Sequence, residues 1–193
     1  MQLILASKSP RRRQLLASLG FPVTYADISV DETLEDDVPI ALAAETIARR
    51  KTEGYNAALL QKDQVLITAD TLVIADGQRL GKPKDRNDAI GMLHRLSGQA
   101  HIVYTGVCLR HKDWQTSFTE ATMVHFRHIA EEEIIHYVDT YKPYDKAGAY
   151  GIQEWIGMIG IDRIEGDYYN VMGLPLCRLY SEIRKQMDLR LDA

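Results

Sequence analysis

The sequence predicts an α/β fold: a mixed, twisted β-sheet with helices on its faces. Apolar runs short enough for buried strands alternate along the chain with segments in which apolar residues recur at helical spacing. Two longer stretches, 64–81 and 100–129, carry turn signals and β-branched residues typical of antiparallel strand pairs. Alternating strands and helices favour a parallel sheet, and the hairpins add antiparallel strands to it.

The length and composition are those of a soluble globular protein. The chain has 193 residues, of which 46% are hydrophobic and 26% are charged. We therefore expect a single domain over residues 1–193, with one core or two small lobes that share a core. The formal net charge of −4 argues against a protein that binds nucleic acid through a broad basic face.

Cysteine usage and hydropathy predict a cytoplasmic protein. Cys108 and Cys177 lie far apart and form no CxxC or zinc-ligand pattern, which favours a reducing compartment. The first apolar run is too short for a secretory signal. No apolar run approaches the roughly 20 residues of a membrane helix, so no membrane association is expected.

The first elements have clear start and stop signals. Residues 3–7 form an apolar run that predicts a buried strand. Ser9 is a favoured N-cap and Pro10 suits the first position of the helix that follows, which Gly20 ends. A second strand is expected at 21–27.

The middle of the chain predicts a long helix, a hairpin and a second helix. The helix extends from residue 39 to about 56, and the hairpin occupies 64–81 around the turn dipeptide Asp76-Gly77. Residues 87–98 form the next helix, which ends at a glycine. The residues expected on the buried side of the first of these helices are Ile40, Ala43, Ala44 and Ile47.

The last part of the chain predicts further strands and helices. Residues 100–129 form two antiparallel strands joined near residues 112–113, and a helix with an acidic first turn follows at 131–141. After a glycine-rich loop we expect a strand at 158–166 and a closing helix at 173–187.

Three consecutive arginines occupy the first turn of the first helix, where the helix dipole disfavours cations. They can lie on a solvated helix end, where the unfavourable term is only about 0.3–1 kcal/mol per charge. Alternatively, Arg11 and Arg12 bind an anion together with Ser7, Ser9 and free backbone N–H groups at the strand-to-helix junction. Successive helical residues point about 100° apart, so we expect Arg13 to point elsewhere.

Asp70 lies in TADT, inside an otherwise apolar strand. Such a carboxylate either occupies an edge position or makes a structural hydrogen bond, or it binds a metal or activates water. Lys82, on the stiff turn LGKPK, and Lys51, near the end of a helix, each have an ordinary explanation as surface cations. The segment 146–153, KAGAYGIQ, either forms a tight turn or allows close approach of a ligand. Neither a Walker A motif nor GxGxxG occurs.

The order of these motifs is more specific than any one of them. ASKSPRRRQLL, VDET, ARRK, ITADTLV, LGKPKD, MLHRLSG, DKAGAYGIQ and GLPL together resemble the Maf family of nucleoside triphosphate pyrophosphatases, from about residue 3 to residue 179. The resemblance implies a Maf/Ham1-like fold with an active-site cleft between two lobes. It also implies hydrolysis of a nucleoside triphosphate to the monophosphate and pyrophosphate, with a divalent cation such as Mg²⁺ or Mn²⁺.

The resemblance also implies roles for particular residues. Ser7, Arg11 and Arg12 match the phosphate-binding motif, Lys51 matches the helix lysine of the family, and Lys82 matches its second lysine. We expect these arginines and lysines to hold the β- and γ-phosphates.

We expect two carboxylates at the reacting centre. Asp70 corresponds to the catalytic proton acceptor, which orients or deprotonates the water that attacks the α-phosphorus. Glu32, in the acidic loop, and Asp70 itself are the expected metal ligands.

Three positions resemble the branch of the family that acts on dTTP and UTP: Arg12, Thr71 and Gln153. The amide of Gln153 and the hydroxyl of Thr71 suit the polar edge of a pyrimidine. Lys8 and the additional Arg13 depart from the commoner motif, and we treat them as peripheral.

The resemblance leaves alternatives open. A sister branch of the family acts on 7-methyl-GTP, and a non-enzymatic, nucleotide-binding regulator of cell division is a further candidate. The expected partner is the nucleoside triphosphate, which can be an ordinary or a modified pyrimidine nucleotide, and no direct nucleic-acid binding is expected. The resemblance also implies a homodimer and a house-cleaning role linked to cell-division arrest.

Overall fold

The structure, a computed structural model, describes residues 1–35 and 37–187. These residues divide into two compact units. Unit 1 comprises residues 1–70, 105–120 and 173–187, and unit 2 comprises residues 71–104 and 121–172. The expected single domain over 1–193 stays a prediction, although three strands belong to both units.

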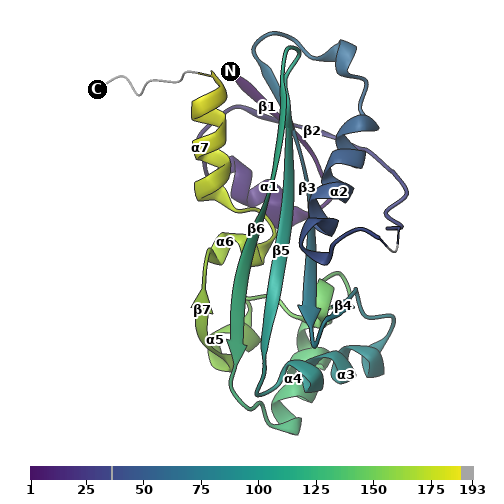
Figure 1. Ribbon diagram of the computed structural model, residues 1–193. Helices are drawn as coiled ribbons and strands as arrows, with labels where there is room; N and C mark the ends of the chain where they lie inside the picture. The colour runs from purple at the N-terminus through teal and green to yellow at the C-terminus, as the bar shows by residue number, and fades with distance from the viewer. Residues whose placement is uncertain (36, 188–193) are drawn as a thin grey trace. The chain divides into compact units, whose positions relative to one another are not determined.

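The elements follow one another in the alternating order that the sequence predicts (Figure 1). The strands are β1 (Gln2–Ala6), β2 (Val23–Ala26), β3 (Gln64–Ala75), β4 (Gln78–Leu80), β5 (Ala100–Arg110), β6 (Gln115–Phe126) and β7 (Ile161–Glu165). The α-helices are α1 (Pro10–Ala17), α2 (Ile40–Glu53), α3 (Arg86–Leu96), α4 (Glu131–Tyr141), α5 (Trp155–Gly160), α6 (Tyr168–Met172) and α7 (Leu176–Met187). Two short 3₁₀ turns, η1 (Ala57–Leu59) and η2 (Ala147–Ala149), complete the described part of the chain.

The strands of the described residues form one mixed sheet, in the order β2-β1-β3-β5-β6-β7 with β4 beside β3. β1 runs parallel to both β2 and β3, and Leu3 is level with Val23 on one side and Val65 on the other. β3 and β4 are antiparallel, as are β6 and β7. The predicted mixed sheet is therefore confirmed.

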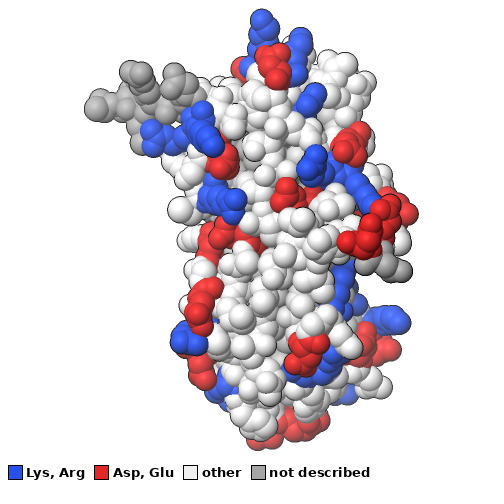
Figure 2. Space-filling view, in the orientation of Figure 1, with Lys and Arg blue, Asp and Glu red and all other residues white. Residues whose placement is uncertain are grey.

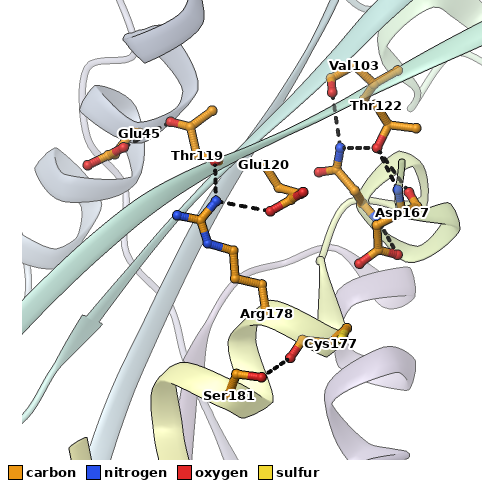
Figure 3. A network of polar contacts seen from close by, with 10 residues as sticks. Glu45, Val103, Thr119, Glu120, Thr122, Asp167, Cys177, Arg178 and Ser181 are labelled. Carbon is orange, nitrogen blue, oxygen red and sulfur yellow. Dashed lines mark hydrogen bonds and ion pairs between the residues drawn. The ribbon is translucent and has the colours of Figure 1, made fainter. Parts of the chain in front are cut away.

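In unit 1, helices α2 and α7 contact opposite faces of β6. The hydroxyls of Ser117 and Thr119 donate to the carboxylate of Glu45 on α2, at 2.6 and 2.9 Å. The side chain of Glu120, the next residue of β6, lies on the opposite face of the strand. Its carboxylate accepts from Arg178 of α7 at 3.0 Å (Figure 3). Side chains alternate across a strand, so these contacts assign each helix to a face.

Gly106 of β5 lets α2 lie directly on the sheet. A Cβ at this position would overlap the backbone of Ala44 and Glu45. Of the residues predicted to be buried on α2, Ala43, Ala44 and Ile47 are buried, whereas Ile40 is 42% exposed. The prediction for Ile40 is wrong because the close contact with the sheet begins one turn later, at Ala44.

Unit 2 has its own apolar core, made by strands and helices that the sequence largely predicts. Its core side chains come from β3, β5, β6, α3, α4 and the segment that carries η2. The hairpin turn at Asp76 and Gly77 has positive φ at both residues, 50° and 71°. This geometry is typical of a two-residue hairpin.

Two elements of unit 2 differ from the predictions. Residues 158–160 belong to helix α5 rather than to a strand, which begins at Ile161. The backbone N–H groups of Gly157 and Met158 donate to the Glu154 carbonyl at 2.9 and 3.2 Å, which starts the helix, and glycine at 157 leaves room for the nearby Ile152 carbonyl.

Helix α6 was not predicted at all, although Asp167 before it is a usable N-cap signal. The Asp167 carboxylate accepts from the backbone N–H of Tyr169 at 2.7 Å. The buried Asn170 side chain donates to Thr122 Oγ1 at 2.8 Å and to the Val103 carbonyl at 3.1 Å, two residues that Figure 3 labels. Among the described helices, none is long and apolar enough to cross a membrane.

Candidate active site

Lys51 lies between the two carboxylates that the sequence assigns to the reacting centre. Its Nζ is 2.8 Å from Asp70 Oδ1 and 2.8 Å from Glu32 Oε1. The side chains of Lys51 and Asp70 are only 14% and 12% exposed. Asp70 therefore occupies a position in the middle of β3 where a neighbouring cation offsets the cost of burying its charge.

A pair of buried hydroxyls fixes α2 against β3 beneath this ion pair. The hydroxyl of Thr52, the residue after Lys51, lies 2.7 Å from the hydroxyl of Thr68. Thr68 precedes Asp70 by two residues, so both side chains lie on the same face of β3. Both hydroxyls are also within hydrogen-bond distance of the Ala48 carbonyl, at 3.2 and 2.6 Å.

The acidic loop that carries Glu32 is held by the end of α2. Arg50 donates a short hydrogen bond to the Thr33 carbonyl, and Asp31 Oδ1 accepts from the Thr33 backbone N–H at 2.9 Å. Hydrogen bonds from Thr33 lower the pKa of Asp31 from its ordinary value. The loop also forms an open hollow of about 450 Å³, lined by Val30, Asp31, Thr33, Leu34, Glu35 and Arg50.

The turn before α1 has the geometry that the sequence predicts. Ser9 caps the helix by accepting from the Arg12 backbone N–H at 3.4 Å, and Ser7 Oγ accepts from the Ser9 N–H at 3.2 Å. Arg12 Nε donates to the Gly173 carbonyl at 2.7 Å.

Arg12 lies within the field of the two carboxylates. Burial lowers the pKa of its guanidinium, while Asp70 and Glu32 raise that pKa and Arg11 lowers it. Arg12 is thus close enough to Asp70 and Glu32 to interact with them electrostatically, and Arg11 lies close enough to interact with Arg12. This proximity favours the anion-site interpretation of the arginines over a solvated helix end.

Arg13 has different partners from Arg12, as expected from the rotation of about 100° between successive residues of a helix. Its Nε donates to the Ser7 carbonyl at 3.1 Å, and its guanidinium lies 4.7 Å from the centre of the Tyr25 ring. Arg13 supports the turn rather than the carboxylate pair.

The remaining predicted residues belong to unit 2. Thr71 follows Asp70 directly in β3, so its side chain lies on the opposite face of the strand. Lys82 is exposed on the turn after β4. Gln153 carries a side-chain oxygen, Oε1, that is buried and has no hydrogen-bond partner among the described residues. Their membership of one site with Asp70 stays a prediction.

The carboxylate pair fits a divalent cation with oxygen ligands. Within residues 1–35 and 37–187, no cluster of three or more His, Cys, Asp or Glu could hold a metal. However, Asp70 Oδ1 and Glu32 Oε1 both contact the ammonium of Lys51, so the two carboxylates are directed towards the same cation. Mg²⁺ is typically held by one or two carboxylates plus substrate phosphates, which is the donor set that Glu32 and Asp70 offer.

Sequence reasoning missed Arg50, Thr52 and Thr68 as residues that hold the site in place. Thr68 is part of the TADT motif, and the other two flank Lys51. Their positions beside predicted site residues were the signal, but their partners lie too far away in the sequence to be inferred.

The sequence matches the family model described as Maf-like protein over residues 2–186. The chain belongs to this Maf-like family.

Curated relatives match the Maf-like chain over nearly its full length. A protein of Bacteroides thetaiotaomicron named dTTP/UTP pyrophosphatase is 50% identical over 185 residues, which cover 95% of each chain. A protein of the same name from Porphyromonas gingivalis is 47% identical over 189 residues, covering 95% of this chain and 93% of its own. A third protein of this name, from Christiangramia forsetii, is 41% identical, and the match covers 97% of this chain and 95% of its own.

A solved structure supports the fold class. The Ham1 protein of Staphylococcus aureus matches 94% of the Maf-like chain and 100% of its own chain, with a TM-score of 0.52 and 17% identity. The similarity confirms the predicted Ham1-like α/β fold.

Proposed function

We propose that this protein is a nucleoside triphosphate pyrophosphatase that hydrolyses dTTP and UTP to the monophosphate and pyrophosphate. The observation that carries the proposal is the position of Lys51 between Asp70 and Glu32, with Arg12 in the field of both carboxylates. Relatives that are 41–50% identical over almost the whole chain and named dTTP/UTP pyrophosphatase support the substrate.

The cations of unit 1 suit a polyphosphate. A nucleoside triphosphate carries roughly four negative charges near neutral pH, judged from the charge of a single phosphate. Arg11, Arg12 and Lys51 bind the β- and γ-phosphates, and Ser7 and the backbone of its turn support them. Lys82 is the remaining phosphate ligand in the proposal. Positive charge around these phosphates stabilises pyrophosphate as the leaving group.

Asp70 acts on the attacking water. Its carboxylate orients a water molecule and accepts one of its protons as the oxygen bonds to the α-phosphorus. The bond between the α-phosphorus and the bridging oxygen to the β-phosphorus breaks, and pyrophosphate leaves with that oxygen. Lys51 holds the carboxylate in place through its 2.8 Å contact.

Glu32 and Asp70 would hold a divalent cation, Mg²⁺ or Mn²⁺. When bound, such a cation neutralises charge on the phosphates. The Glu32 loop is held by Arg50 of α2 through the Thr33 carbonyl, which keeps the second carboxylate beside the first.

Gln153, Thr71 and Arg12 determine the base in this proposal. The buried, unpartnered Oε1 of Gln153 lacks the donor that a buried oxygen normally has. The N3–H of uracil or thymine is a donor of the required kind, so a bound pyrimidine would satisfy this oxygen.

The alternatives fit the chain less well. At positions 12, 71 and 153 it has Arg, Thr and Gln, the pattern that resembles the dTTP/UTP branch rather than the 7-methyl-GTP branch. For a regulator that binds nucleic acid directly, a basic face is expected. The face in Figure 2 instead shows acidic and basic side chains interspersed, and the net charge is −4. A homodimer and a cytoplasmic location stay predictions.

The experiment is a product analysis with dTTP, UTP, 7-methyl-GTP and ATP in the presence of Mn²⁺. We expect pyrophosphate and the monophosphate from dTTP and UTP. Orthophosphate as the product would refute the reaction type. Asp70→Asn should be inactive, whereas Asp76→Asn, at the exposed hairpin turn that follows the same strand, should keep wild-type activity.

A further inference from the structure

A buried polar network in unit 2 holds the ends of the segment 146–154. Lys146 is only 7% exposed, and its Nζ lies 2.8 Å from Asp145 Oδ1 and 3.0 Å from Glu154 Oε1. The other carboxylate oxygen of Glu154 accepts a short hydrogen bond from the hydroxyl of Tyr137, a buried residue of α4. Glu154 is the partner that Lys146 and Tyr137 share, so removing its carboxylate would take a charge partner from the buried ammonium and an acceptor from the buried hydroxyl.

The same network reaches the backbone around Gln153. The Gly151 N–H donates to Tyr137 Oη at 3.1 Å, and the Glu154 N–H donates to the Gly151 carbonyl at 3.0 Å. A Cβ at Gly151 would lie 2.8 Å from Glu154 Cδ, so only glycine admits the carboxylate there. Gln153 therefore lies between two residues whose positions the network fixes.

One further contact joins this segment to the turn that carries Lys82. The Gly148 N–H donates to the carbonyl of Gly81 at 3.0 Å. Gly148 and Ala149 both have positive φ, 70° and 60°, and alanine rarely adopts this conformation without support. The surrounding contacts hold the segment in a single strained conformation.

We propose that Lys146, Glu154 and Tyr137 are positioning residues that fix Gln153 and thereby set the selectivity between uracil and cytosine nucleotides, an inference that rests on the proposed function. Uracil and cytosine are alike in size but exchange donors and acceptors along one edge. A glutamine amide offers both a donor and an acceptor, so it rejects the wrong base only when the chain holds it in a defined place.

The protonation state of Tyr137 suits this role. Burial raises the pKa of its hydroxyl, and the neighbouring Glu154 carboxylate raises it further. The hydroxyl thus stays protonated at neutral pH, donates to Glu154, and accepts from Gly151.

The test compares Tyr137→Phe with Tyr141→Phe, using pyrophosphate release from UTP and from CTP. Tyr141 lies one turn further along α4 and stacks on Tyr137 at 5.1 Å, but it is 39% exposed. We expect Tyr137→Phe to reduce the ratio of kcat/KM for UTP to that for CTP about tenfold, as for one lost hydrogen bond to the base. The loss should lie in KM for UTP, with kcat nearly unchanged, and Tyr141→Phe should keep the wild-type ratio.

Glu154→Gln provides a second variant, because it keeps the side-chain size and removes the charge that pairs with Lys146. It should show the same loss of selectivity, and it decides the question if Tyr137→Phe does not fold. A folded variant of either residue with the wild-type ratio overturns the inference, as does a wild-type enzyme that treats UTP and CTP alike. If the wild-type protein releases no pyrophosphate from UTP, the proposed function fails instead.

Discussion

The hydroxyls of Thr52 and Thr68 lie 2.7 Å apart and join helix α2 to strand β3 at the level of the active-site ion pair. Thr52 is adjacent to Lys51, and Thr68 faces the same side of the strand as Asp70. The contact fixes the position of α2 along β3, and therefore the distance between the Lys51 ammonium and the Asp70 carboxylate.

Thr52→Val should therefore weaken catalysis as well as stability. The variant removes one hydroxyl, while Thr68 keeps its bond to the Ala48 carbonyl, so we expect a loss of about 1 kcal/mol in the free energy of unfolding. The kcat should fall several-fold as Lys51 loses its fixed position. Urea denaturation and pyrophosphate release measure the two effects.

Thr46→Val is the matched control for this prediction. Thr46 also lies on α2 and donates to the carbonyl four residues earlier, at 3.0 Å, but it has no hydroxyl partner on β3 among the described residues. A loss of kcat in this variant equal to that of Thr52→Val would show that the effect belongs to the helix and not to the pair.

Lys51→Met should nearly abolish activity. The variant leaves Asp70 and Glu32 facing one another without the ammonium that contacts both, and it removes a phosphate ligand. We expect kcat/KM for UTP to fall at least about 100-fold, the range seen when one electrostatic contact to a transition state is removed. Arg49→Met, at an exposed position on the same helix, should behave as wild type. Near-normal turnover by Lys51→Met would remove the lysine from the proposed mechanism.

Gly106→Ala should destabilise the protein strongly. The added methyl group would overlap the backbone of Ala44 and Glu45, so α2 must move away from the sheet. Overpacking of this kind costs about 1–3 kcal/mol or more, and the displaced helix carries Lys51, so activity should fall too.

Gly91→Ala is the control for this substitution. Gly91 lies in α3, and a Cβ there meets no described atom within 4 Å. Alanine should stabilise this helix by up to about 1 kcal/mol. Equal melting temperatures for the two variants would contradict the close packing of α2 on β5.

Local sequence signals predicted most of the fold because they act over a few residues. Ser9 and Pro10 mark the start of α1, and Asp76-Gly77 forms the expected hairpin turn. The predicted strand at 158–166 is wrong for residues 158–160, because neither period nor length separates a buried helix from a strand in so short an apolar run. In the folded chain the N–H groups of Gly157 and Met158 donate to the Glu154 carbonyl and start a helix there.

In the candidate site, too, local motifs predicted some residues, whereas contacts between distant parts of the chain could not be predicted. Arg12, Asp70 and Lys51 could be named from motifs, and the folded chain brings them together. The contacts that hold them join residues far apart in the sequence, such as Arg12 with Gly173 and Thr52 with Thr68. No pattern in a single sequence encodes such pairs, so the supporting residues emerged only from the structure.

The stability of the protein should fall in mildly acid solution because of His101. Its imidazole is buried, stacked on Phe126 and 2.7 Å from Tyr150 Oη. Burial, and secondarily His125, lowers the pKa of His101 from 6.5 to about 4. Between these values the unfolded chain binds a proton that the folded chain does not, so stability is full above pH 6.5 and declines as pH falls towards 4. The loss reaches about 3 kcal/mol.

Urea denaturation at a series of pH values between 7 and 4.5 measures this loss, with His101→Gln as the variant. Without the buried imidazole, this part of the pH dependence should disappear, although the variant itself is less stable at pH 7. His94→Gln removes a histidine that is 44% exposed and pairs with Glu131, and it should keep the wild-type slope. The prediction fails if His101→Gln loses stability with falling pH as steeply as the wild-type protein, because the proton uptake would then belong to other groups.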